Sequence, residues 1–186
     1  MNIEIISGSP RKESVTNRVA LHLEKTIIAR THHHVNIIDV REWNVQCLQE
    51  EVYSSVDNGP EEFKPLVEMM LNADAFIIVS PEYNGSYTAA TKNLFDHFPK
   101  QRHKAFGIVT ASPGALGGIR AALQLQLLIC ALFGIPSPYM LVTPSVEKKF
   151  DASGNLTDPG FQKAVDTFLD EYLWIAESLK PEVVFN

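Results

Sequence analysis

Short apolar runs alternate with longer runs of mixed character along this chain. The apolar runs are rich in β-branched residues, as in buried strands, whereas apolar positions in the longer runs recur with helical spacing. Strict alternation of this kind predicts an α/β fold of three layers, with helices on both faces of a parallel sheet. The five repeats favour a five-stranded sheet in the order 2-1-3-4-5. We predict strands over residues 2–7, 35–40, 73–80, 105–111 and 137–143, and helices over residues 15–29, 61–71, 88–98, 118–133 and 160–179.

Two connections are longer than the pattern requires. Residues 41–59 follow the second predicted strand, and loops of that length are often functional. Residues 144–158 form a polar arm before the last predicted helix. This arm either lies on the surface of its own chain or reaches over a neighbouring subunit.

Composition narrows the class of protein. With 186 residues, 45% of them hydrophobic and 20% charged, the chain fits a single domain spanning residues 1–186. A net charge of −6 and a pI near 5.5 argue against nucleic acid as a partner.

The sequence also argues against a membrane protein and against a metal centre. The longest apolar stretch, residues 121–135, contains Gln124 and Gln126 and is too short to cross a bilayer. Three adjacent histidines at residues 32–34 cannot all face one metal ion, so we expect a solvated turn there. Cys47 and Cys130 fit no zinc or redox motif, which favours two reduced thiols in a cytoplasmic protein.

The loop after the first predicted strand has the chemistry of a phosphate-binding site. Gly8 lets the backbone leave the strand, and the start of the next helix offers free N–H groups and a positive dipole end. The loop has neither a Walker motif nor a dinucleotide glycine pattern, so it suits a terminal monophosphate. Helix capping alone would explain one of its hydroxyls but not all of them. The candidate phosphate-binding residues are Ser9, Arg11, Ser14 and Thr16.

Two further loops follow the third and fourth predicted strands, at the edge where open α/β sheets bind ligands. Residues 80–86 contain an Asn-Gly turn that exposes backbone groups to a planar ligand. Tyr83 in this loop either lies against an aromatic ring or packs on the rim. Residues 111–118 contain three glycines, which fit either a close approach to a flat ligand or a plain turn. Together with the phosphate loop, these segments indicate a site for flavin mononucleotide (FMN).

At the level of motifs, the chain resembles the NAD(P)H-dependent FMN reductase family, whose fold is flavodoxin-like. Gly-Ser-Pro-Arg-Lys-Glu-Ser at residues 8–14 is similar to the family's phosphate loop. Ser-Pro-Glu-Tyr-Asn-Gly-Ser at residues 80–86 and Ser-Pro-Gly-Ala-Leu-Gly-Gly at residues 112–118 are similar to its two flavin-ring motifs. The resemblance implies that Ser9, Arg11, Ser14 and Thr16 hold the FMN phosphate. It implies that the ring is lined by Pro81, Glu82, Tyr83, Asn84, Gly85, Ser112, Gly114 and Gly117.

The resemblance also implies a reaction. NADPH or NADH would pass a hydride to FMN, and the reduced flavin would discharge to a small acceptor such as free flavin, a quinone or an azo compound, with ping-pong kinetics. The hydride step needs no acid or base from the protein, so no catalytic side chain is assigned. The main rival is a flavodoxin-type electron carrier without its own NAD(P)H activity. A nucleotide-binding regulatory module without redox function is a third hypothesis.

The predicted helix over residues 118–133 bears on assembly. It is apolar on nearly every side, and such a helix must be covered all round. One side can pack on the sheet, and a partner subunit is the natural cover for the other. The resemblance likewise implies a homodimer or homotetramer. The alternative is that the last helix of the same chain provides the cover.

Overall fold

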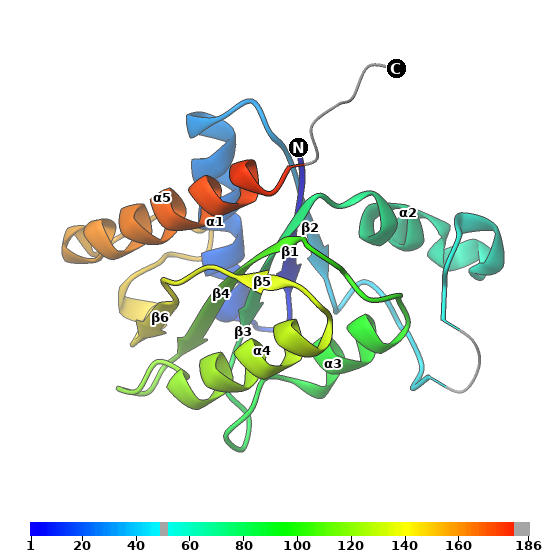
Figure 1. The fold of residues 1–186 in the computed structure, drawn as a ribbon. Helices are drawn as coiled ribbons and strands as arrows, with labels where there is room; N and C mark the ends of the chain where they lie inside the picture. The colour runs from blue at the N-terminus through cyan, green and yellow to red at the C-terminus, as the bar shows by residue number, and fades with distance from the viewer. Residues whose placement is uncertain (49–51, 181–186) are drawn as a thin grey trace.

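The computed structural model describes residues 1–48 and 52–180, and places a sheet between two layers of helices (Figure 1). Its strands are β1 (Asn2–Ser7), β2 (His34–Asp39), β3 (Ala75–Ser80), β4 (Ala105–Ser112), β5 (Ile135–Pro136) and β6 (Leu141–Pro144). Its α-helices are α1 (Thr16–Arg30), α2 (Lys64–Asn72), α3 (Ala89–Asp96), α4 (Ile119–Ala131) and α5 (Gln162–Ser178). The helices predicted from residues 61 and 160 begin with 3₁₀ turns, Glu61–Phe63 and Pro159–Phe161, which lead into α2 and α5.

All strand pairs of the sheet are parallel, in the order β2-β1-β3-β4-β5, with β6 also paired to β4. The predicted strand order and the flavodoxin-like fold are therefore confirmed. The prediction of a fifth strand over residues 137–143 is only partly correct. Within that range only residues 141–143 form a strand, as part of β6, whereas β5 precedes the range, and the two strands pair with the two ends of β4. Pro138 lies between the two pieces and has no backbone N–H to donate to a ladder.

Two hydrophobic clusters lie on opposite faces of the sheet. Leu23 of α1 and Phe168 of α5 belong to one cluster. Met70 of α2, Phe95 of α3 and Leu125 of α4 belong to the other. Since α5 covers the face opposite α4, the alternative in which the last helix shields α4 is wrong for the described residues (Figure 1).

The polar arm at residues 144–158 packs on α1 of its own chain. Arg18 Nη1 donates to the Phe150 carbonyl at 3.0 Å, and Lys25 Nζ donates to the Ser153 carbonyl at 2.7 Å. His22 Nδ1 lies 3.0 Å from the Gly154 carbonyl oxygen. In this structure the arm is therefore held against its own chain.

Part of the long connection at residues 41–59 lies along α3. Asn93 Nδ2 donates to the carbonyls of Val45 at 2.9 Å and Gln46 at 3.1 Å. Residues 49–51 of this connection lie outside the described residues.

Within residues 1–48 and 52–180, no helix is long and apolar enough to cross a bilayer. The same part of the chain contains no cluster of three or more His, Cys, Asp or Glu side chains that could hold a metal ion. His33 lies 2.9 Å from Glu177, and both cysteines are free and exposed.

Candidate functional site

The loops that follow β1, β3 and β4 meet at one edge of the sheet around a cavity of about 190 Å³. Eight of the twelve predicted residues line it: Ser9, Arg11, Ser14, Thr16, Pro81, Glu82, Tyr83 and Ser112. The other predicted residues, Asn84, Gly85, Gly114 and Gly117, do not. Five residues that the sequence did not single out also line it: Glu13, Val15, Ala111, Pro113 and Glu147.

The loop between β1 and α1 has backbone donors that the protein does not use. Among the described residues, no N–H of residues 9–15 donates a hydrogen bond to another group of the chain. Ser9 and Thr16, at the two ends of this stretch, are buried with 2% of their surface exposed. An acidic side chain in the first turn of α1 would offset the positive end of the helix dipole, and that turn contains none. Unused amides at a helix start are the usual cradle for a phosphate.

Ser14 has a structural task as well. Its Oγ accepts a hydrogen bond from the Asn17 N–H at 3.2 Å, as a helix-capping serine does. Asn17 Oδ1 in turn accepts from the Ser7 hydroxyl at 2.8 Å. Helix capping therefore explains the hydroxyl of Ser14. It does not explain why Ser9, Arg11 and Thr16 lie in the same loop.

Gly8 is required by a close approach of α3. A Cβ atom at this position would lie 2.2 Å from Thr91 Oγ1, far inside contact distance. Thr88, which caps α3, donates from Oγ1 to the Gly8 carbonyl at 2.5 Å. Absence of a side chain at residue 8 thus lets α3 and the phosphate loop touch.

The loop after β3 is a tight hairpin. Asn84 and Gly85 have positive φ values of 52° and 83°, and Tyr83 and Ser86 exchange backbone hydrogen bonds of 2.9 and 3.2 Å. Positive φ at both central residues is typical of a type I′ Asn-Gly turn. The predicted turn is confirmed, but Asn84 and Gly85 at its tip do not line the cavity.

Tyr83 joins the hairpin to the phosphate loop. The Arg11 guanidinium lies over the Tyr83 ring, 4.9 Å from its centroid. The Tyr83 hydroxyl is buried and has no hydrogen-bond partner among the described residues. A buried hydroxyl without a partner beside unused amides fits a polar ligand in this cavity.

Glu82 binds the start of α4. Its Oε2 accepts from the backbone N–H of Arg120 at 3.0 Å and of Ala121 at 3.4 Å, and its Oε1 lies 3.3 Å from Arg120 Nη1. Since α4 begins after Gly118, which has no side chain to cap it, Glu82 supplies the missing acceptors from another loop. The carboxylate is thereby committed to the protein, although the residue lines the cavity.

The glycines after β4 shape the turn into α4. Gly117 is buried with φ 60°, and a Cβ atom there would lie 2.6 Å from Val142 and 2.8 Å from the Pro144 backbone. Gly117 therefore packs against β6, which explains its absence from the cavity lining. Ser112 Oγ accepts from the Gly114 N–H at 3.0 Å and closes the start of the turn.

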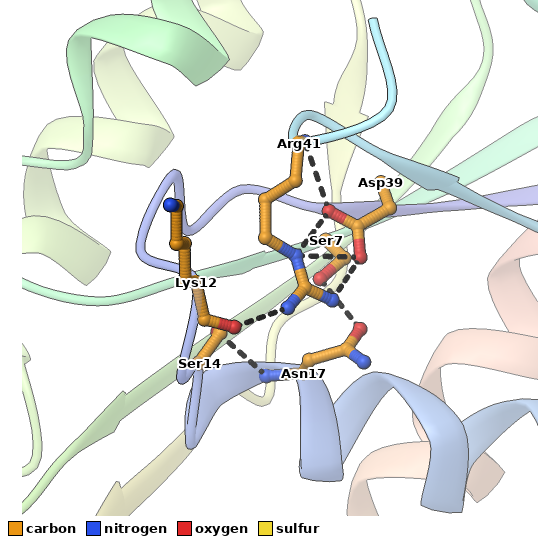
Figure 2. Close-up of polar contacts among 6 residues, drawn as sticks. All are labelled: Ser7, Lys12, Ser14, Asn17, Asp39 and Arg41. Carbon is orange, nitrogen blue, oxygen red and sulfur yellow. Dashed lines mark hydrogen bonds and ion pairs between the residues drawn. The ribbon is translucent and has the colours of Figure 1, made fainter.

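Sequence reasoning missed a polar group behind the phosphate loop. Arg41 and Asp39, at the end of β2, form a salt bridge, and Arg41 Nη1 donates to the Lys12 carbonyl at 2.9 Å (Figure 2). An acidic residue ending a strand, two residues before an arginine, was the available signal. This short pattern does not indicate a contact with residue 12 until the register of β1 against β2 is known.

A sheet in the order 2-1-3-4-5 defines the flavodoxin-like fold, and the unused amides after its first strand lie where such folds bind their ligands. A model of the NADPH-dependent FMN reductase family matches residues 1–145, and the chain belongs to that family.

Individual relatives agree with this assignment. An FMN-dependent NADPH-azoreductase of Staphylococcus aureus is 29% identical over 173 residues, which span 90% of each protein. The flavoenzyme FerB of Paracoccus denitrificans, an NAD(P)H:(acceptor) oxidoreductase, superposes with a TM-score of 0.81 at 21% identity, covering 97% of this chain and 99% of FerB. A flavodoxin variant of Pseudomonas aeruginosa superposes with a TM-score of 0.51 at 19% identity, covering 96% and 97%. The two superpositions reflect the shared fold.

Family membership confirms an oxidoreductase that uses FMN, with NAD(P)H as the electron donor. The observed site fits FMN, because residues of the loop with unused amides and Tyr83, whose hydroxyl is buried without a partner in the described residues, line the same cavity.

Proposed function

We propose that this protein takes a hydride from NAD(P)H onto FMN and then reduces a small acceptor, in a ping-pong reaction. When bound, FMN supplies the redox chemistry, and the protein holds and orients it. The observation that carries the proposal is that residues of the loop with unused amides line one cavity together with Tyr83 and Ser112. One end of that cavity suits a dianionic phosphate, and the other suits a flat ring.

Each side chain has a binding task in this proposal. Ser9, Thr16 and the backbone amides would hold the phosphate, and Arg11 would leave the Tyr83 ring to pair with it. Pro81, Tyr83 and Ser112 would contact the flavin ring. Glu82 would act indirectly, by fixing the hairpin to α4. The acidic side chains at the cavity are those of Glu13, Glu82 and Glu147, and the proposed hydride step requires none of them.

The proposed class of acceptor is supported by a relative. The similar staphylococcal protein is named as an azoreductase, which supports azo compounds as acceptors here. Free flavins and quinones remain in the proposed set, since all of these acceptors are planar and can stack on a flavin. NADPH and NADH are both proposed as donors.

Anaerobic mixing tests the proposal directly. The flavin absorbance of the purified protein should fall after addition of NADPH or NADH, and it should return when an azo dye or quinone is added. Flavin that stays oxidised with both donors would instead favour the flavodoxin-type electron carrier. Initial rates at varied donor and acceptor concentrations should give parallel double-reciprocal lines. Intersecting lines would contradict the ping-pong mechanism.

We propose that the protein assembles as a homodimer, or as a homotetramer built from such dimers, through the outer side of α4. Leu123 and Leu127 of this helix are 50% and 64% exposed, and Leu116 just before it is 60% exposed. Leu123 and Leu127 are four residues apart and therefore lie on the same side of α4. Large exposed apolar side chains gathered in this way often mark a protein–protein contact. Sedimentation at micromolar concentration tests this, and a monomer would refute it.

We also propose a cytoplasmic location, supported by the two free thiols of Cys47 and Cys130. Cell fractionation with an antibody against the protein tests this proposal, and recovery outside the cytoplasm would refute it.

A further inference from the structure

The phosphate loop lacks a scaffold of its own. Its backbone N–H groups from residue 9 to 15 make no bond to the described chain, so nothing within the loop fixes the direction in which they point. The loop is tied at its start by the Gly8 N–H to the Val79 carbonyl at 2.9 Å. It is tied at its end by Ser14 and Asn17. The middle of the loop is tied by Arg41.

Arg41 makes this contact from behind the loop. Its Nε lies 2.9 and 3.0 Å from the two carboxylate oxygens of Asp39, its Nη2 pairs with the same carboxylate, and its Nη1 donates to the Lys12 carbonyl at 2.9 Å. Figure 2 shows the guanidinium between Asp39 and the loop. Asp39 is only 5% exposed, so the carboxylate holds the guanidinium from a fixed position in the fold.

The contact with the Lys12 carbonyl also fixes the orientation of the next backbone N–H, that of Glu13. In a trans peptide, the carbonyl of one residue and the N–H of the next point to opposite sides. Arg41 holds the Lys12 carbonyl, so the Glu13 N–H is turned away from Arg41. Arg41 lines a separate cleft of about 400 Å³, and Glu13 lines both this cleft and the cavity that contains Ser9 and Tyr83. An amide turned away from Arg41 is therefore available to a ligand on the cavity side of the loop.

We propose that Arg41 is a positioning residue for the phosphate of FMN: bound to Asp39, it orients the loop amides without touching the cofactor. This inference rests on the proposed role of the loop in the proposed function. The Arg41–Asp39 pair carries no net charge, and the guanidinium donors are already occupied by the protein. Its contribution is therefore one of geometry, unlike that of Arg11, which faces the cavity and carries a charge without an ion pair in the described residues.

The test compares two ligands that differ only in the phosphate. The full chain, stripped of flavin, is titrated with FMN and with riboflavin, and flavin fluorescence gives the two values of Kd. We expect Arg41→Ala to weaken FMN about 10- to 100-fold, the loss expected when charge-assisted hydrogen bonds are misaligned. We expect riboflavin affinity to change less than about twofold, since that ligand has no phosphate.

Two variants separate geometry from charge and from general damage. Arg41→Lys keeps the positive charge beside Asp39, but one ammonium cannot span both Asp39 and the Lys12 carbonyl, so it should lose FMN selectivity almost as Arg41→Ala does. Arg18→Ala is the matched control, because Arg18 also binds a backbone carbonyl and lines the same cleft, yet contacts Phe150 rather than the loop. This control should keep the wild-type ratio of the two Kd values.

The outcomes are distinct. A fall in the FMN-to-riboflavin preference in both Arg41 variants, but not in Arg18→Ala, supports the inference. Equal weakening of both flavins, or a wild-type preference in Arg41→Lys, overturns it. If the wild-type protein itself binds riboflavin as tightly as FMN, the phosphate role of the loop is wrong, which is a failure of the proposed function rather than of Arg41.

Discussion

The buried carboxyl group of Glu4 should make the free energy of unfolding depend on pH. It lies in β1 with 2% of its surface exposed, and only one carboxylate oxygen has a partner, Asn36 Nδ2 at 2.9 Å from Oε1. The other oxygen, Oε2, is buried without a hydrogen bond among the described residues. Burial raises the pKa of Glu4 from its ordinary value of 4.5 to about 7, and the Asn36 bond lowers it by a smaller amount.

The sign of the effect follows from the raised pKa. Between pH 4.5 and about 7, the folded protein keeps the Glu4 proton while the unfolded chain releases it. The unfolded state therefore binds fewer protons in this range, and the free energy of unfolding falls as pH rises. At about 1.4 kcal/mol for each pKa unit, the wild-type protein loses about 3 kcal/mol across this window.

The perturbation is Glu4→Gln, which copies the shape of the protonated acid and keeps the acceptor for Asn36. We expect its stability, relative to wild type, to rise by about 3 kcal/mol from about pH 4 to about pH 8. Urea unfolding followed by circular dichroism at several pH values measures this difference. Glu68→Gln on the exposed side of α2 is the matched control and should stay within about 0.5 kcal/mol of wild type throughout. A Glu4→Gln curve parallel to wild type across the whole range would refute the reasoning.

Three other predictions follow from the site and the helix layers. Arg11→Ala should weaken FMN by about 1.5–3 kcal/mol and more so at low salt, and an unchanged Kd in a flavin titration would contradict its phosphate role. Leu127→Glu should give monomers in sedimentation experiments if α4 forms the dimer interface, and a variant that stays dimeric excludes this helix. Gly8→Ala should destabilise by about 1–3 kcal/mol, because the new Cβ meets Thr91 Oγ1. Thr91→Ala should offset part of that loss in a double-mutant cycle, and strictly additive effects would show that the clash is relieved elsewhere.

The alternation of predicted strands and helices along the sequence was sufficient to predict the three-layer α/β fold. Buried runs such as that of residues 75–80 are apolar on both faces, and a strand of that kind needs helices on both sides of its sheet. The five strand–helix repeats favoured the strand order 2-1-3-4-5, which the structure has. The position of the phosphate loop could be predicted for the same reason, since a loop between the first strand and first helix must lie at the ligand-binding edge. The prediction of one continuous strand over residues 137–143 failed at residues 137–140, which lie between β5 and β6 and include Pro138, a residue without an N–H to donate to β4.

Which side chains face the ligand cavity was decided by the tertiary structure. Glu82 belongs to the loop after β3 and was predicted to line the flavin ring. Its carboxylate instead binds the start of α4, which lies nearby only in the folded chain. Gly117 looks like a ligand-approach glycine but is required by β6. Arg41 had no visible link to residue 12 until the pairing of β1 with β2 brought Asp39 beside Ser7. Periodicity records only which residues are buried locally, whereas contacts between distant segments depend on strand register and helix packing, and these are set by the whole chain at once.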